Sequence, residues 1–206
     1  MLPYLIFGIT YGFAAAAQPG QFQAYVVSQS LANGWRRTFP VAFAPILSDM
    51  PIVPLAMFIL ANVPTLLIHL LQLAGGLFLL YLAAGAVTAC RNYRSPDAAP
   101  ASSAQQTVIK AAVVNLLNPN PYIGWALVMG PLLLKAWREA PANGIALVVS
   151  FYVTMIVMTL GIVLLFSAAR TLGPRIARLL VGFSAAGLAG FGFYQLWSGT
   201  TALLYR

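Results

Sequence analysis

Long stretches without a charged residue are the feature that most constrains this chain. The 206 residues include three acids and eleven Lys and Arg, and these divide the rest into uncharged runs. Several runs exceed the roughly 20 mostly apolar residues that a helix needs to cross a bilayer. Charged residues make up only 7% of the chain, whereas a soluble domain carries about a quarter. We therefore expect an all-α, polytopic membrane protein whose first partner is the lipid bilayer.

Two signals divide the longest runs into helices. The run from 50 to 90 is too long for one helix, and Ala61-Asn62-Val63-Pro64 supplies a turn, because the residue before a proline is pushed out of helical geometry. The sequence SPDAAPASSAQQ has the small, polar composition of a linker. We predict six transmembrane helices near residues 2–28, 38–61, 65–89, 108–134, 142–169 and 178–203. They form a three-helix repeat over 1–90, a linker over 91–107 and a second repeat over 108–206.

The cations predict the orientation of these helices. Loops rich in Lys and Arg resist translocation and stay in the cytoplasm. Eight cations fall in the first, third and fifth loops, and three fall in the fourth loop and at the C-terminus. We predict that both termini lie outside and that the linker is cytoplasmic. Because each half has three helices, the second half enters the membrane from the opposite side, so the repeats are inverted.

Three polar or helix-breaking features interrupt the apolar helices. Residues 18–23 place three amides, a proline and a glycine in the first helix, and residues 115–121 place three amides and two prolines in the fourth. Asp49 lies in the second helix. At a rise of about 1.5 Å per residue, Pro19, Asp49 and Pro119 all lie about 14–17 Å from the predicted cytoplasmic ends, near mid-membrane. A broken helix in each repeat is typical of a secondary transporter.

The breaks suggest how a solute could bind. A broken helix presents unpaired N–H groups at one end and carbonyls at the other, which can hold a carboxylate and an ammonium. The amides add donors and acceptors without fixed charge. Alternatively, they only satisfy the kinked backbone or link helices. The candidate solute-binding residues are Gln18, Pro19, Gly20, Gln21, Gln23, Asn115, Asn118, Pro119 and Asn120.

Asp49 is the candidate proton-coupling residue. An Asp at the centre of a span costs roughly 2.5–3.5 kcal/mol on insertion scales, so it is functional by default. No charged partner lies at the same depth in the predicted helices. Desolvation then favours the protonated carboxyl group, which alternating hydration could load and unload. The alternative is a structural carboxylate that hydrogen-bonds an unwound backbone.

The scarcity of reactive residues excludes other classes of protein. One Cys and one His rule out a disulfide framework, a Cys-x-x-Cys redox pair and conventional zinc or iron–sulfur sites. We therefore predict no catalytic residue, no metal and no cofactor, and not an enzyme. The few cations are too widely spread for nucleic acid. Gly8 and Gly12 predict close helix packing. The aromatic residues Trp125, Trp137, Trp197 and Tyr205 are expected to include anchors at the membrane interface.

Three motifs resemble the L-lysine exporter (LysE/RhtB) family over essentially the whole chain. They are Gly-x-x-x-Gly leading to Pro19-Gly20, Asp49 in the second helix, and VNLLNPNPYIGW opening the fourth. The resemblance implies a six-helix exporter in the bacterial inner (plasma) membrane, which moves amino acids and related small solutes outward with the proton-motive force. It implies Pro19, Gly20, Asp49, Asn118 and Pro119 as functional positions.

The chain departs from the family pattern at two positions, of which the first bears on the solute. The family usually has Pro where this chain has Gln21, and Gly where it has Ser48. We predict a secondary active exporter of amino acids or related zwitterions that is proton-coupled and works by alternating access. The alternatives are a channel or a scaffold without coupled transport, and a membrane enzyme is disfavoured. The sequence is compatible with a homo-oligomer.

Overall fold

The computed structural model describes residues 1–18, 20–58, 65–91, 103–169 and 174–204, and every regular element within them is a helix. Four of these helical segments are long and apolar enough to cross a membrane. They cover Trp35–Met57, His69–Thr88, Pro141–Ala169 and Arg178–Thr201. The first helix, α1 (Leu2–Ala17), is apolar but shorter. The chain is therefore an all-helical, multi-pass membrane protein.

In the first half of the chain, the structure differs from the prediction at the first helix. The predicted helix over 2–28 is two helices, α1 and α2 (Gln21–Asn33). The second predicted helix begins with α3 (Trp35–Thr38) and a 3-10 turn, η1 (Phe39–Phe43), and continues as α4 (Ala44–Phe58). The third is α5 (Thr65–Arg91). The predicted turn at 61–64 lies outside the described residues.

The second half opens with another interrupted helix. The predicted helix over 108–134 consists of α6 (Ala104–Leu116), α7 (Pro119–Gly124), a π-helical turn η2 (Trp125–Met129) and α8 (Gly130–Glu139). The α6 helix begins four residues earlier than predicted because Ser103 caps it, accepting a hydrogen bond from the Gln106 N–H. The last two helices, α9 (Pro141–Ala169) and α10 (Pro174–Leu204), are continuous.

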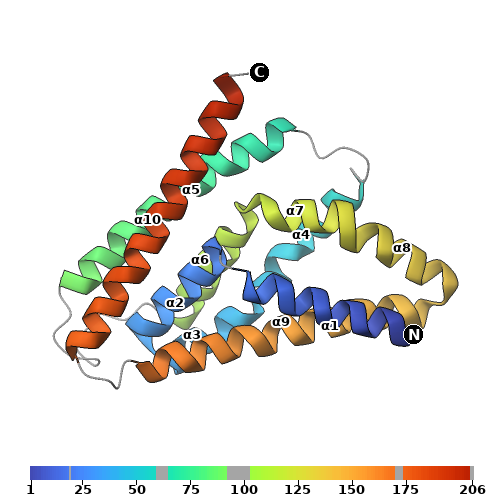
Figure 1. The fold of residues 1–206 in the computed structure, drawn as a ribbon, viewed down its shortest axis with the longest axis horizontal. Helices are drawn as coiled ribbons and strands as arrows, with labels where there is room; N and C mark the ends of the chain where they lie inside the picture. The colour runs from blue at the N-terminus through green and yellow to red at the C-terminus, as the bar shows by residue number, and fades with distance from the viewer. Residues whose placement is uncertain (19, 59–64, 92–102, 170–173, 205–206) are drawn as a thin grey trace.

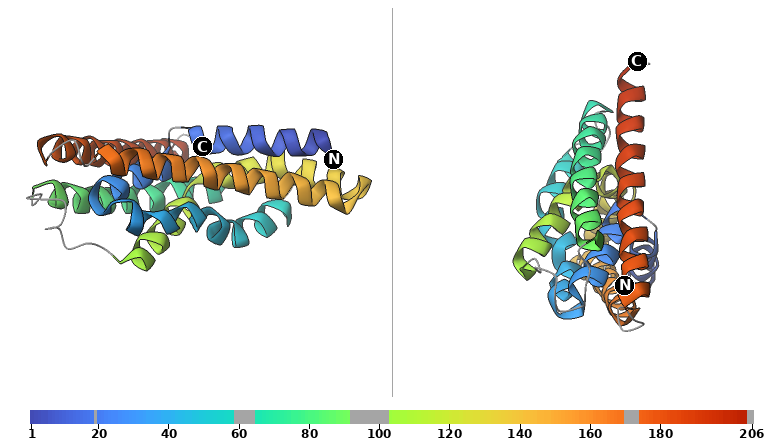
Figure 2. Two further views of the ribbon diagram at one scale, coloured as in Figure 1. Left: turned by 90° about the horizontal axis from the view of Figure 1, so that it is seen from below. Right: turned by 90° about the vertical axis from the view of Figure 1, so that its left-hand side faces the viewer.

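The helices pack as two pairs with the interrupted segments beside them (Figure 1). One pair is α1 with α9, and the other is α5 with α10, which leans away from the first (Figures 1 and 2). Glycine lets α1 and α9 touch: a Cβ on Gly12 would lie 2.6 Å from the carbonyl oxygen of Phe151. The predicted packing role of the early glycines is confirmed. Two buried clusters of apolar side chains form the core.

The α5–α10 pair meets the second interrupted helix at one close contact. A Cβ on Gly75 of α5 would lie 2.7 Å from the carbonyl oxygen of Leu117 and 3.0 Å from Nε2 of Gln195 on α10. Leu117 is the residue at which α6 has just ended. Only a glycine therefore fits where α5 crosses this break.

Candidate functional site

At the break between α1 and α2, a side chain caps the C-terminus of α1, whereas no side chain caps the N-terminus of α2. Nε2 of Gln23 donates to the carbonyl oxygens of Ala15 and Ala16 at 3.2 Å each, so this side chain caps the C-terminus of α1. Gly20 precedes α2 in an extended conformation, and no side chain caps the N-terminus of α2. The first N–H groups of α2, with the positive end of its helix dipole, are therefore open to a ligand.

The break between α6 and α7 is satisfied internally. The Asn118 side chain accepts a hydrogen bond from the Asn120 N–H at 3.1 Å and caps α7. The hydroxyl of Tyr122 donates to the carbonyl of Leu116 at 2.9 Å. The first and third residues of α7 are prolines, which have no N–H. The expectation of unpaired N–H groups at both breaks is therefore wrong here, because the NPNP sequence removes or caps them.

Asp49 lies between the two breaks and is held by three neutral donors. Its side chain is 5% exposed. The Tyr152 hydroxyl and the Trp125 indole N–H donate to Oδ2 at 2.8 and 3.2 Å. Nδ2 of Asn115 donates to Oδ1 at 3.4 Å and also donates to the Ser48 hydroxyl at 2.7 Å. Oδ2 is thus occupied by two donors, whereas Oδ1 has one long hydrogen bond and keeps capacity for another group.

Sequence reasoning missed two of these partners. Trp125 is one of the four candidate interface anchors, but it is 4% exposed and its N–H reaches Asp49, so it is not one of the anchors. Tyr152 lies in the most apolar span of the chain, and its hydroxyl was not singled out. The available signal was a phenol in the middle of an apolar run, where a polar group needs a partner.

Aromatic rings form a continuous wall beside the acid. The Phe151 ring lies 5.9 Å from that of Tyr11, 6.1 Å from Trp125 and 5.0 Å from Tyr152, centroid to centroid. Offset and edge-to-face contacts at these distances are favourable. Because α1 and α9 approach closely, the Tyr11 and Phe151 rings are held beside each other. The wall therefore depends on the packing of α1 against α9.

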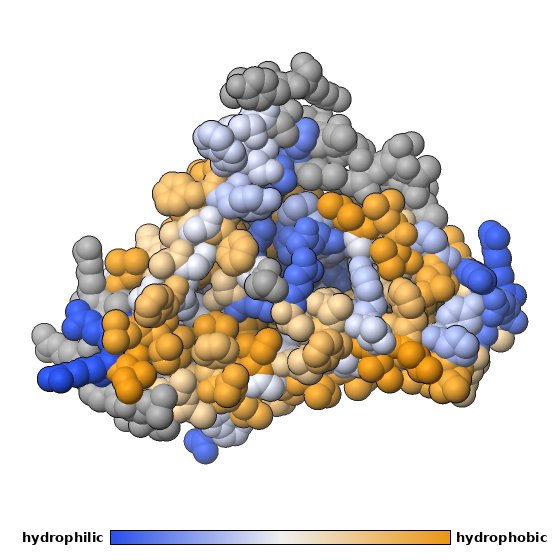
Figure 3. Space-filling model, viewed as in Figure 1, coloured by the Kyte–Doolittle hydropathy of each residue, from blue (hydrophilic) through white to orange (hydrophobic). Residues whose placement is uncertain are grey.

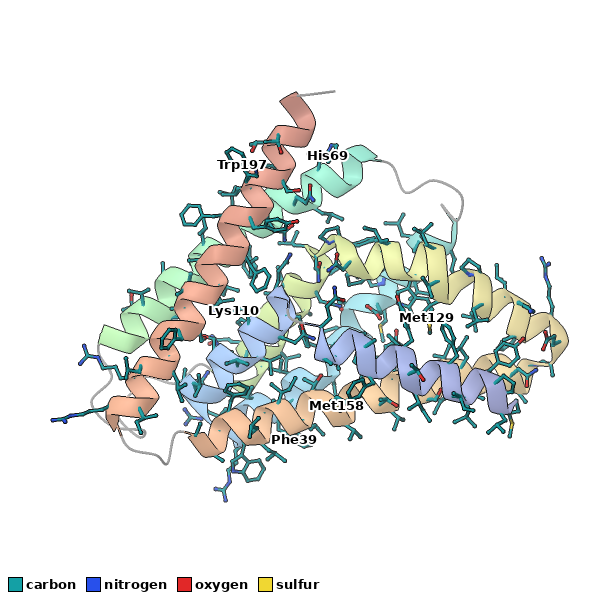
Figure 4. All side chains as sticks on the ribbon, viewed as in Figure 1. Phe39, His69, Lys110, Met129, Met158 and Trp197 are labelled. Carbon is teal, nitrogen blue, oxygen red and sulfur yellow. The ribbon has the colours of Figure 1, made fainter. Side chains whose placement is uncertain are left out.

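A cavity of about 390 Å³ lies between the breaks, beside Asp49. Figure 3 shows hydrophilic residues gathered in the middle of a largely hydrophobic face, and Figure 4 shows Met129 in the space between α1 and the α7–α8 segment. The predicted site residues that line the cavity are Gln18, Gly20, Gln23, Asp49, Asn115, Asn118 and Asn120. The structure thus brings together residues from both halves of the chain.

Three predicted site residues do not line the cavity or cannot be placed. Gln21 is buried, with 9% exposure, but does not line it. Pro119 is buried behind the lining as the first residue of α7. Pro19 lies outside the described residues. Within the described ranges, no three His, Cys, Asp or Glu side chains come together, so this cavity offers a metal ion one carboxylate and neutral groups only.

The comparisons with known proteins identify the family. No curated protein and no solved structure matches the chain. The family model of the LysE type translocator matches residues 13–199, which cover both breaks and Asp49. Since this match spans most of the sequence, the resemblance found in the motifs is confirmed, and the chain belongs to the LysE type translocator family, a family of membrane transport proteins.

Proposed function

We propose that the protein is a secondary active exporter of amino acids or related small zwitterions, proton-coupled through Asp49, in the bacterial inner membrane. The observation that carries this proposal is a buried carboxylate beside a cavity that is lined by residues of two interrupted helices. Interrupted helices around a mid-membrane site are the usual architecture of solute binding in secondary transporters. Membership of a translocator family supports transport rather than catalysis.

The two ends of a zwitterion fit different parts of the cavity. The uncapped N-terminus of α2, at Gly20 and Phe22 in the lining, suits a carboxylate. Oδ1 of Asp49 retains hydrogen-bonding capacity and suits an ammonium. The N-terminus of α7 is capped by Asn118, so it does not compete for the carboxylate. Because the N-terminus of α2 is uncapped and that of α7 is capped, the cavity imposes one orientation on the solute.

The same carboxylate can carry a proton. The Trp125 N–H can only donate, so Oδ2 must remain an acceptor whichever form the carboxyl takes. Oδ1 is then the atom that binds the proton. A proton and a solute ammonium compete for this atom, and such competition couples proton entry to solute release. Asp49 lies beside both breaks, where hinge movement would open the cavity to one side and then to the other.

Helix directions support the six-span arrangement with inverted repeats. Gly8 and Gly12 of α1 approach α9 in increasing residue order, so these helices run the same way. Gly76 approaches Leu196 and Gly192 approaches Leu80, so α5 and α10 run in opposite directions. In a chain that crosses the membrane six times, the first and fifth spans run the same way, and the third and sixth spans run in opposite directions. An even number of crossings puts both termini on the same side, and the bias of Lys and Arg among the loops favours the outside.

Asp49→Asn in proteoliposomes tests the coupling. Asparagine keeps an oxygen toward Trp125 and Tyr152, so the fold should persist, but it cannot bind the proton. For one proton per solute, a gradient of one pH unit drives about tenfold accumulation, since one unit corresponds to about 1.36 kcal/mol. We expect Asp49→Asn to lose this accumulation. Counterflow of an amino acid at equal concentrations should weaken but remain measurable at high amino-acid concentration, because the variant loses the charge that faces the ammonium and keeps the N-terminus of α2 that faces the carboxylate. The control is Glu139→Gln, which neutralises an exposed acid at the end of α8 that does not line the cavity.

Two results would contradict the proposal. If Asp49→Asn accumulates solute like the wild type, the carboxyl group does not couple the proton. If the wild-type flux neither saturates nor depends on the pH gradient, the protein is a channel.

A further inference from the structure

We propose that the cavity selects neutral amino acids with a large apolar side chain, such as leucine, methionine and phenylalanine, and that Phe151 and Met155 set this preference. The inference rests on the proposed function and adds the class of solute. It follows from two properties of the lining: its charge and the position of its apolar side chains.

The charge of the lining excludes charged side chains on the solute. Asp49 is the one acid among the described residues that line the cavity, and none of them is Lys or Arg. In the proposed orientation, Asp49 faces the α-ammonium and the N-terminus of α2 faces the α-carboxylate. A lysine or glutamate side chain would then bring a charge into the cavity without a partner. Burying such a charge is strongly unfavourable.

Three of the five amides that line the cavity already use one end of the side chain within the protein. Gln23 uses its amide N–H on the end of α1, and Asn118 uses its oxygen on the Asn120 N–H. Asn115 uses its amide N–H on Ser48 and Asp49. The Gln18 and Asn120 side chains make no hydrogen bond to the described residues, so discrimination against a polar solute side chain rests on the apolar lining and not on the amides.

The apolar part of the lining, formed by Phe151, Met155 and Met129, fits an alkyl or aromatic side chain. Phe151 and Met155 are four residues apart on α9, so they project from one face of that helix. Both are buried and line the cavity, together with Met129. Methionine side chains are flexible and polarizable, and they adapt to apolar groups of different shapes. The next residue after Phe151 is Tyr152, which holds Asp49.

The position of Phe151 determines which part of the solute contacts the apolar part of the lining. Trp125 touches Asp49 through its indole N–H and packs edge-to-face on Phe151. An amino acid whose ammonium lies at Asp49 therefore has the aromatic wall within reach of its side chain. A cavity of about 390 Å³ also has room for such a solute, since small-molecule sites start at about 300 Å³.

Counterflow into proteoliposomes tests the preference directly. Vesicles with purified wild-type protein are loaded with unlabelled leucine, methionine, phenylalanine, alanine, glutamine, lysine or glutamate, and uptake of the same labelled amino acid is measured. We expect uptake of the three large apolar amino acids to exceed that of alanine by about tenfold or more, because each methylene in an apolar pocket contributes about tenfold or more. We expect lysine and glutamate to give the background of empty vesicles.

Variants of Met155 and Phe151 test the apolar part of the lining. Met155→Gln has nearly the shape of the wild-type residue but adds hydrogen-bonding groups, and Met155→Leu keeps the surface apolar. We expect Met155→Gln to lower the ratio of leucine to glutamine uptake by about tenfold. Met155→Leu should keep the wild-type ratio. Phe151→Leu should lower uptake of phenylalanine more than uptake of leucine, because it removes the ring contact.

The outcomes separate this inference from the proposed function. If lysine, glutamate or glutamine exchanges as fast as leucine, the substrate class is wrong, although amino-acid exchange itself stands. If the wild type prefers leucine and Met155→Gln leaves the ratio unchanged, the assignment of Met155 is wrong. If no amino acid of any class exchanges, both the inference and the proposed function are overturned.

Discussion

Gly8→Ala is the sharpest test of the packing that holds the site. An added Cβ would overlap the Ser150 hydroxyl and lie 2.5 Å from the carbonyl oxygen of Leu147. The hydroxyl can rotate away, but the carbonyl belongs to the α9 backbone. Ordinary contact begins at 3.4 Å, so α1 and α9 must separate by 0.9 Å, the difference between these two distances.

The cost of this separation can be estimated. Overpacking a well-packed core costs typically about 1–3 kcal/mol. For a chain of this size, 1 kcal/mol shifts the Tm by about 2–4 °C, so Gly8→Ala should lower the Tm by about 2–12 °C. The assay is thermal unfolding of the detergent-solubilised protein, followed by tryptophan fluorescence. Leucine counterflow should also fall, because Tyr11 and Phe151 lie on the separated helices.

The matched control is Gly161→Ala on α9. A Cβ there meets nothing within 4 Å, so the substitution only improves helix propensity. It should raise stability by about 0.5–1 kcal/mol, or leave the Tm unchanged if lipid or detergent offsets the gain. If Gly8→Ala and Gly161→Ala unfold at the same temperature, α1 does not pack on α9 through Gly8, and the reasoning about the aromatic wall fails with it.

Three further predictions address the breaks, the acid and the topology. Gln23→Leu should destabilise the protein by about 1–3 kcal/mol, measured as a lower Tm, because the carbonyls at the end of α1 lose two hydrogen bonds; an unchanged Tm would show that water replaces this cap. Tyr152→Phe removes the shortest hydrogen bond to Asp49 and should reduce proton-driven accumulation while leaving the Tm within a few degrees of the wild type; undiminished accumulation would contradict its role. In a variant whose single cysteine, Cys90, is replaced by Ser, a cysteine introduced by Ser95→Cys in the linker should react with a membrane-impermeant maleimide only in inside-out vesicles. Labelling of intact cells would contradict the predicted orientation.

The places where the fold and the site could be predicted share a physical cause. Charge-free runs locate the apolar helices because a charge is costly in the membrane, and Pro, Gly and amide residues locate the breaks because they remove backbone hydrogen bonds. The two breaks, counted at Pro19 and Pro119, could therefore be placed at the level of Asp49 by depth alone. Their depth depends on counting residues, which needs no knowledge of tertiary packing.

What could not be predicted depends on which side chain faces which helix. Gln21 and Gln23 look equivalent in the sequence, yet Gln23 turns back to cap α1 and lines the cavity, whereas Gln21 is buried away from it. Trp125 resembles an interface anchor until the π-helical turn η2 is known to begin at it and to place it in the core. These facts follow from helix rotation and contact, which a depth count does not contain.

The close contact at Gly75 links the two breaks mechanically. Because α5 leaves no room for a side chain at the carbonyl of Leu117, a change in the angle between α6 and α7 that moves this carbonyl toward Gly75 would press on α5. The α5 helix is packed along α10, and α10 in turn packs against α2, the segment that follows the first break. The α5–α10 pair therefore contacts the segments at both breaks, and under the proposed mechanism bending at one break would be transmitted through the pair to the other.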